Sequence, residues 1–154
     1  MDLLYLKTSL QNIANMGEQN VAEKILSYFL GAGCFSYAIG TSFRDSLCAA
    51  IIGSLVGFYM ICSKYRIKSR VLITIIASVL TAVLSHFCVA IGLGSKLSFI
   101  IIGAMMDLVP GVAFVNSVRE FSQNNFATGQ TLLTSALLTC VSMASGVALV
   151  EQLV

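Results

Sequence analysis

Long apolar stretches constrain the fold of this chain more than any other feature. They occupy residues 22–41, 46–62, 71–91, 97–117 and 131–150, and a helix needs about 20 apolar residues to cross a bilayer core. Hydrophobic residues make up 57% of the sequence and charged residues 10%, whereas soluble domains carry about 25% charged residues. We therefore expect an all-α, polytopic membrane protein whose residues 22–154 form a bundle of five transmembrane helices.

The first 21 residues differ from these stretches. Their apolar side chains recur at spacings of three and four, with polar residues between them, and include Leu3, Leu6, Leu10 and Ile13. This spacing is typical of an amphipathic helix that lies on membrane lipid or against the bundle. A cytosolic extension is the alternative. No basic segment precedes the first leucines, so the pattern does not indicate a cleavable signal peptide.

Basic residues predict the orientation, because short cytoplasmic loops are enriched in Lys and Arg. The loop between the second and third stretches holds Lys64, Arg66, Lys68 and Arg70. Placing it inside puts the N-terminus and the loop over 118–130 in the cytoplasm of an inner-membrane protein, and the C-terminus outside. A second five-span unit that followed would then be inverted, an arrangement common in secondary transporters. The net charge of +2 gives no basic footprint for a nucleic-acid partner.

Asp107 lies in the middle of the fourth stretch, as the eleventh of its 21 residues. An aspartate at that depth costs about 2.5–3.5 kcal/mol on insertion scales, so its carboxyl group must face a cavity, a partner or a proton. Pro110 and Gly111 follow. Proline removes a backbone donor and crowds the carbonyl four residues earlier, which predicts either a discontinuous helix or an ordinary kink. A protonated Asp107 that only packs against another helix is also an alternative.

Further polar residues are candidates for a solute or proton path. Asn116 and Arg119 share one helix face near the predicted cytoplasmic end of the fourth stretch, where Arg119 is alternatively an interfacial anchor. Asp45, in the first outer turn, is a candidate or a solvated corner, and His86 is a proton carrier or a satisfied core residue. Nothing in the sequence indicates a catalytic triad, a nucleotide loop or a metal site, so we expect neither an enzyme nor a cofactor. Gly53 and Gly57, and Ser142 and Gly146, are spaced for close helix approach.

Residues 40–53 and 101–121 resemble the threonine/serine exporter family, specifically its N-terminal five-span domain. The first segment, GTSFRDSLCAAIIG, is similar to a Gly-Gly-Ser-x-x-Asp turn at Gly40, Ser42 and Asp45. The second resembles a Leu-Val/Ile-Pro-Gly segment followed by Asn-x-x-Arg-Asp-Leu. Its matching residues are Leu108, Val109, Pro110, Gly111, Asn116 and Arg119. The resemblance covers nearly the whole chain.

The sequence also departs from the family pattern at particular positions. Thr41 replaces a glycine, and Asp107 stands where the family is uncharged. Glu120 and Phe121 replace Asp-Leu, and Ser135 lies about where the last span often has a glutamate. The usual upstream Gly-Ala-x-Thr-x-Arg-x-Glu segment is absent. These departures are compatible with a truncated domain, a split subunit or a degenerate copy.

The resemblance implies a half-unit of a secondary exporter that uses the proton-motive force to export threonine or serine. Two-protein members of the family are linked to dicarboxylate (succinate-type) export, in which a five-span domain works with a smaller five-span partner. A homo-oligomer is the alternative assembly. Asp107, Pro110 and Gly111 would then line the path, and Asn116 and Arg119 would meet the carboxylate of the small-molecule solute. A non-transporting scaffold subunit and a self-assembling pore are the rival functions.

Overall fold

The computed structural model describes residues 21–63 and 69–153, and all of the regular structure in these ranges is helical. The elements are α2 (Val21–Ala38), α3 (Phe43–Ser63), α4 (Arg70–Ala90), α5 (Leu97–Met105), the 3₁₀ turn η1 (Met106–Leu108), α6 (Gly111–Ser122) and α7 (Phe126–Leu153). The predicted all-α class is confirmed. The amphipathic helix expected over residues 1–21 falls, except for Val21, outside the described residues, as do Lys64, Arg66 and Lys68.

Three helices of the described chain are long and apolar enough to cross a membrane, namely α3, α4 and α7. The pair formed by Leu97–Leu108 and Gly111–Ser122 qualifies as a fourth span that is bent by 56°. The helix α2 has 18 residues and is long enough, but it is not among these candidates because Glu23 and Lys24 in its first turn lower its mean hydropathy. The structure therefore identifies three to four candidate spans where the sequence predicted five.

The second and last helices are longer than the apolar stretches that predicted them. The helix α3 has 21 residues and α7 has 28. The loop expected over 118–130 is a tight turn between α6 and α7. Asn124 adopts a left-handed φ of 61° there, and the Asn125 N–H donates to the Glu120 carbonyl at 2.9 Å. This is a Schellman-type helix end, which hydropathy alone does not reveal.

Small residues let α2 and α3 approach closely, as the spacing of Gly53 and Gly57 predicted. A Cβ on Gly53 would lie 2.5 Å from the Ala32 Cβ, and Gly57 is covered by the ring of Tyr28. The Ser46 hydroxyl of α3 donates to the Gly33 carbonyl of α2 at 2.6 Å. In a bilayer, where lipid is as apolar as leucine, such close packing and interhelical hydrogen bonds hold helices together.

The helices α4 and α7 pack in the same way and run parallel. Gly146 of α7 lies directly against the Ser78 side chain of α4, and Ser142 is buried one turn earlier. Farther toward the C-terminal ends of both helices, His86 of α4 reaches Glu151 of α7. The predicted small-residue face of the last span is thus confirmed as a contact with α4.

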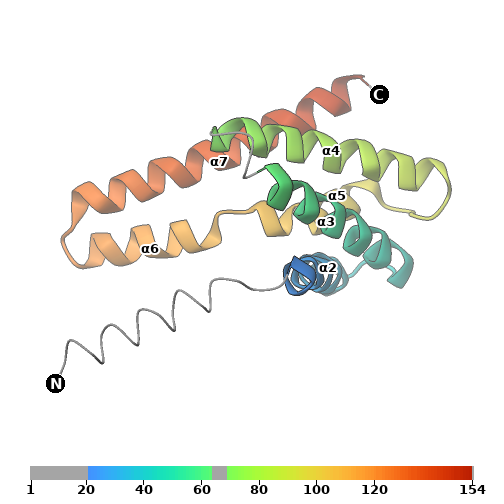
Figure 1. Ribbon diagram of the computed structural model, residues 1–154, viewed down its shortest axis with the longest axis horizontal. Coiled ribbons are helices and arrows are strands. Elements are labelled where there is room, and N and C mark those ends of the chain that lie inside the picture. Colours follow the sequence, from blue (N-terminus) through green and yellow to red (C-terminus); the bar gives the residue numbers. More distant parts are fainter. Residues whose placement is uncertain (1–20, 64–68, 154) are drawn as a thin grey trace.

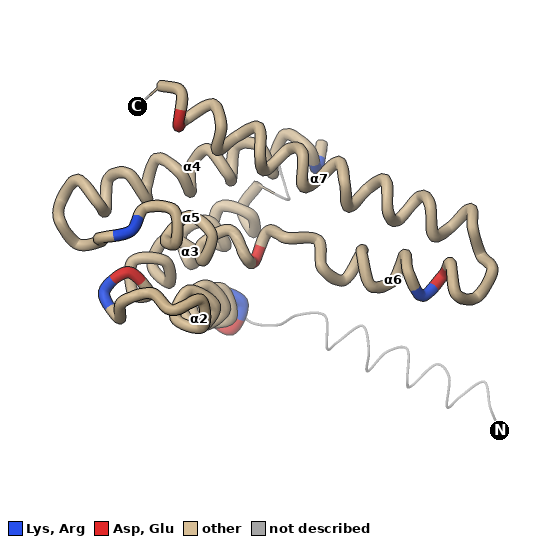
Figure 2. Tube along the Cα trace, turned by 180° about the vertical axis from the view of Figure 1, so that it is seen from behind, with Lys and Arg blue, Asp and Glu red and all other residues tan. Residues whose placement is uncertain are grey.

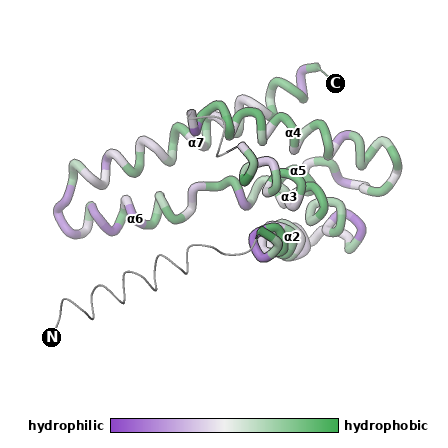
Figure 3. The backbone as a smooth tube through the Cα atoms, viewed as in Figure 1, coloured by the Kyte–Doolittle hydropathy of each residue, from purple (hydrophilic) through white to green (hydrophobic). Residues whose placement is uncertain are grey.

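The buried core lies where α3, α4 and α5 meet, with Leu108 added from η1 and Met143 from α7. Its members are small or medium in size and include Ala49, Ile52, Ala77, Ile100 and Ala104. Many large apolar side chains point outward instead, as expected of helices that face lipid. Figure 3 shows hydrophobic residues along most of α4 and hydrophilic residues gathered at the turn between α6 and α7.

The helices differ in direction (Figure 1). The helices α4 and α7 run across the view, whereas α2 is seen nearly along its axis, so α2 crosses them steeply. The helix α6 and the first part of α7 form an antiparallel hairpin that extends beyond the other described helices. The break between α5 and α6 lies where this hairpin leaves the bundle.

Candidate functional site

The candidate fourth span is broken at the predicted position, and its backbone shows why. Pro110 has no N–H to offer to the Met106 carbonyl, so the Val109 N–H donates to it instead at 3.2 Å, which closes the 3₁₀ turn. Pro110 has φ −79° and ψ 53°, and the Gly111 N–H donates to the Val109 carbonyl at 2.8 Å. These values describe an inverse γ-turn. The interrupted backbone thus satisfies part of its hydrogen bonding internally, as a bilayer requires.

Asp107 belongs to the 3₁₀ turn at this break, and its carboxyl group lies against glycines of two other helices. A Cβ on Gly31 of α2 would lie 2.7 Å from Oδ1, and one on Gly53 of α3 would lie 3.7 Å from Oδ2. A side chain at the first of these positions would force the carboxyl group to move. The side chain of Asp107 therefore connects η1 to α2 and α3. We call the surface formed by Gly31 and Gly53, against which the carboxyl group lies, the glycine seat.

The side chain of Asp107 is half-buried, but its Oδ2 atom is fully buried and has no hydrogen-bond partner in the described part of the chain. An ionised oxygen without a partner is costly at membrane depth. A proton on the carboxyl group, or the ammonium group of a small solute beside it, would remove that cost. The carboxyl group of Asp107 in the glycine seat is therefore chemically suited to bind a proton or a cationic group.

Asp45 is completely buried in the first turn of α3, so the alternative of a solvated corner is wrong. Its Oδ1 accepts a hydrogen bond of 2.7 Å from the Ser95 N–H, which ties the loop between α4 and α5 to the start of α3. Its Oδ2 is buried and without a partner among residues 21–63 and 69–153. Asp45 contacts the loop that precedes α5, whereas Asp107 lies beyond the other end of α5.

His86 contacts a residue that sequence reasoning did not single out. Its Nε2 lies 3.2 Å from Oε1 of Glu151 in the last turn of α7, and both side chains are partly exposed. The sequence could have indicated this contact, because Glu151 is a second titratable residue at the end of the bundle where His86 was predicted, the outer end. The pair bridges α4 and α7, and it does not include Asp107.

Asn116 and Arg119 share the exposed side of α6, as predicted, but the structure does not bring them to Asp107. The helix α6 begins after the break, and at 1.5 Å per residue Arg119 is about 12 Å along it from Gly111. Glu120 accepts a hydrogen bond from the Asn125 amide at 3.0 Å and so belongs to the turn. The predicted residues therefore lie in four separate places: the break, the exposed side of α6, the start of α3, and the contact between α4 and α7.

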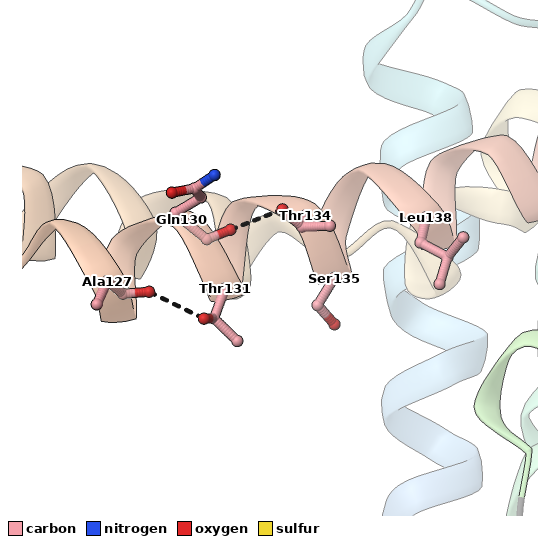
Figure 4. A pocket seen from close by; sticks show the side chains of 6 residues that line it. All are labelled: Ala127, Gln130, Thr131, Thr134, Ser135 and Leu138. Carbon is pink, nitrogen blue, oxygen red and sulfur yellow. Dashed lines mark hydrogen bonds between the residues drawn. The ribbon is translucent and has the colours of Figure 1, made fainter.

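An open groove of about 640 Å³ follows one face of α7 (Figure 4), and sequence reasoning did not predict it. Its lining residues are Ala127, Gln130, Thr131, Thr134, Ser135 and Leu138. The hydroxyl groups of Thr131 and Thr134 donate to carbonyls one turn earlier, at 2.9 and 2.8 Å. The recurrence of polar residues at spacings of three and four was the available signal. Asp107 does not line this groove.

These features define a class of protein: a helical membrane protein with several candidate spans, one of them interrupted beside an acidic residue. The chain matches the model of the ThrE family, described as "Putative threonine/serine exporter", over residues 1–154. The protein therefore belongs to the threonine/serine exporter family, which is a family of transporters rather than of enzymes. No curated protein and no solved structure matches the chain.

Proposed function

We propose that this protein is a half-unit of a proton-coupled secondary exporter of small amino acids, with threonine and serine as its substrates. The observation that carries the proposal is the candidate fourth span, which is interrupted at Pro110, three residues after Asp107, whose carboxyl group lies in the glycine seat. Family membership supports the substrate class. Broken helices beside intramembrane polar groups are a recurrent way to build a binding site near the bilayer midplane.

Proton coupling is assigned to Asp107. Its buried Oδ2 lacks a partner in the described chain, so the neutral and ionised carboxyl groups interact differently with the glycine seat. Such a group can release its proton when the seat opens to one side of the membrane and regain it from the other. The carboxyl group would then alternate between binding a proton and facing the ammonium group of the amino acid.

The half-unit role rests on topology. We propose that α2 is the fifth crossing, tilted relative to α4 and α7, because it packs closely along α3, which is itself a candidate span. We also propose that the N-terminus lies in the cytoplasm of an inner-membrane protein with the C-terminus outside. A partner unit of five spans, either an inverted second subunit or another copy of this chain, would complete the solute path. Arg119 and Asn116 on the protruding hairpin of α6 and α7 would then meet the solute carboxylate at the cytoplasmic entrance.

A measurement of proton-driven transport by the Asp107→Asn variant tests the proposal. Inside-out vesicles from cells that express the chain together with its neighbouring reading frame should accumulate labelled threonine when the interior is made acidic. We expect Asp107→Asn to lower the initial rate at least about tenfold, which corresponds to about 1.4 kcal/mol, while the amount of protein in the membrane stays the same. Glu23→Gln, a neutralisation on the exposed first turn of α2, is the matched control.

The rival functions predict other outcomes. Unchanged transport by Asp107→Asn would refute its role in coupling. If the chain co-purifies with its partner but no pairing transports threonine, serine or succinate, the chain is a scaffold. A proton leak from the chain alone would indicate a pore.

A further inference from the structure

A second groove, of about 300 Å³, lies between the start of α3 and the loop that follows α4. It is lined by Arg44, Leu47, Cys48, Ile51, Gly92 and Leu93. Three of the apolar side chains are about half exposed, with values of 42% for Leu47, 53% for Ile51 and 55% for Leu93. The lining is thus an apolar surface with a single cation, and none of these residues belongs to the glycine seat.

The wall formed by the loop is held by specific bonds. Gly92 has a left-handed φ of 82°; its N–H donates to the Val89 carbonyl at 2.9 Å, and the Leu93 N–H donates to the Cys88 carbonyl at 3.1 Å. This pattern is a Schellman helix end. The loop is also tied to α3 by the bond from the Ser95 N–H to Asp45. The groove is therefore built by the fold.

The charge at the groove is available to a ligand. Arg44 is exposed, and the one ion pair found among the described residues joins His86 and Glu151. The adjacent Asp45 is completely buried and accepts the Ser95 N–H. Figure 2 shows basic residues at the turn between α2 and α3 and at the start of α5, at the same end of the molecule. Arg44 is the second residue of the candidate span α3, so with α3 across the bilayer its side chain would lie at the level of the lipid headgroups.

Arg44, Leu47 and Ile51 follow one another at spacings of three and four, so they lie on one face of α3. At 1.5 Å per residue, this face runs about 10 Å from the guanidinium-bearing residue into the apolar part of the helix. A ligand that matches it has an anionic group at one end and a hydrocarbon chain next to it. Phospholipids have that chemistry, and they would surround this face of α3 in a bilayer.

We propose that this groove binds one phospholipid, preferably with an anionic headgroup. The guanidinium group of Arg44 binds the lipid phosphate, and an acyl chain lies along Leu47, Ile51 and Leu93. Free inorganic phosphate would leave these apolar side chains uncovered. This inference requires only that α3 spans the membrane, and it does not depend on the transport function.

The absence of tryptophan from the sequence allows a direct test. Ile51→Trp places one fluorophore in the groove, and Leu137→Trp places one on α7 at a residue of similar exposure, 50%, outside the groove. Each purified variant is reconstituted with dibrominated phosphatidylglycerol or phosphatidylcholine in competition with the unbrominated lipid. Quenching of the tryptophan then gives the relative affinity for the two headgroups.

We expect phosphatidylglycerol to be favoured about fivefold at Ile51→Trp, the factor expected for one basic residue at an anionic lipid surface, and not at Leu137→Trp. Adding Arg44→Gln should remove the preference. Arg44→Lys should keep most of the preference, which would show that the loss in Arg44→Gln comes from the missing charge and not from misfolding. Lys96→Gln should leave it unchanged, because the Lys96 Nζ lies over the Phe99 ring, 5.2 Å from its centroid, and does not line the groove.

Equal affinity for the two lipids at Ile51→Trp would overturn the proposal, as would a preference that survives Arg44→Gln. Relief of quenching by millimolar inorganic phosphate alone would assign the charge to a free anion instead. Loss of lipid quenching as protein concentration rises would assign the groove to a contact between copies of the chain.

Discussion

At the scale of single residues, glycines decide where the acidic group of the fourth span sits. Asp107 lies against Gly31 and Gly53, which are 76 and 54 residues earlier in the sequence. The expected depth of Asp107 in the membrane follows from its position in the middle of an apolar stretch. The identity of its neighbours does not, because the packing of α2, α3 and η1 brings them together.

A double-mutant cycle tests this contact. Gly31→Ala places a methyl group against Oδ1 of Asp107, and overpacking of this kind costs roughly 1–3 kcal/mol, partly offset by the better helix propensity of alanine. In an Asp107→Ala background the cost should disappear. The thermal unfolding midpoint of the purified protein measures it.

Gly146→Ala is the control for this cycle, since its methyl group would meet Ser78 and the Ile75 carbonyl on α4. Its cost should be the same in both backgrounds, because distant sites are additive. Equal costs of Gly31→Ala in both backgrounds would show that Asp107 does not occupy the glycine seat.

At the scale of elements, the interruption of the fourth span is the feature that the sequence predicted best. Pro110 marked the position, but whether the helix would kink or break was open. The structure shows a 3₁₀ turn, an inverse γ-turn and a bend of 56°. The helix α2 was predicted less well as a span, because its charged first turn and its glycines lower its hydropathy even though it packs along α3.

Pro110→Ala should lengthen the fourth span. Restoring an N–H at this position lets the helix continue, and straightening two segments of about 18 Å each from a 56° bend adds roughly 4 Å end to end, from the rise of 1.5 Å per residue. Spin labels at Ser98 and Ser122, in a background without native cysteines, report this distance by pulsed electron resonance.

Gly111→Ala keeps the proline and meets no atom within 4 Å, so it should leave the distance unchanged. An unchanged distance in Pro110→Ala would mean that packing against α2 and α3, and not the proline, causes the break.

At the scale of the whole molecule, the number of crossings determines where the termini lie. Five crossings place them on opposite sides of the membrane, whereas four place them on the same side. The described helices include three to four candidate spans. With the bent pair counted as one span, the total is five crossings if α2 also crosses and four if it does not. Two parallel spans need one crossing between them in the opposite direction, and for α4 and α7 the bent pair of α5 and α6 is the candidate.

Reporter fusions test the proposed topology. Green fluorescent protein at the N-terminus should fluoresce, because it folds in the cytoplasm, and alkaline phosphatase after the C-terminus should be active, because it needs the oxidising exterior. The reciprocal fusions should both be silent. Reporters that place both termini in the cytoplasm would exclude α2 as a crossing and with it the five-span half-unit.

By itself, the sequence determined the properties that depend on local composition and spacing. These are the all-helical membrane class, the position of the break at Pro110, the small-residue helix contacts and the family. Tertiary structure alone decided which distant residues meet: Asp107 with Gly31 and Gly53, Asp45 with the Ser95 N–H, and His86 with Glu151. The physical reason is that hydropathy and helix breaking act within a few turns of one segment, whereas the partner of a buried polar group is set by how helices far apart in the chain pack.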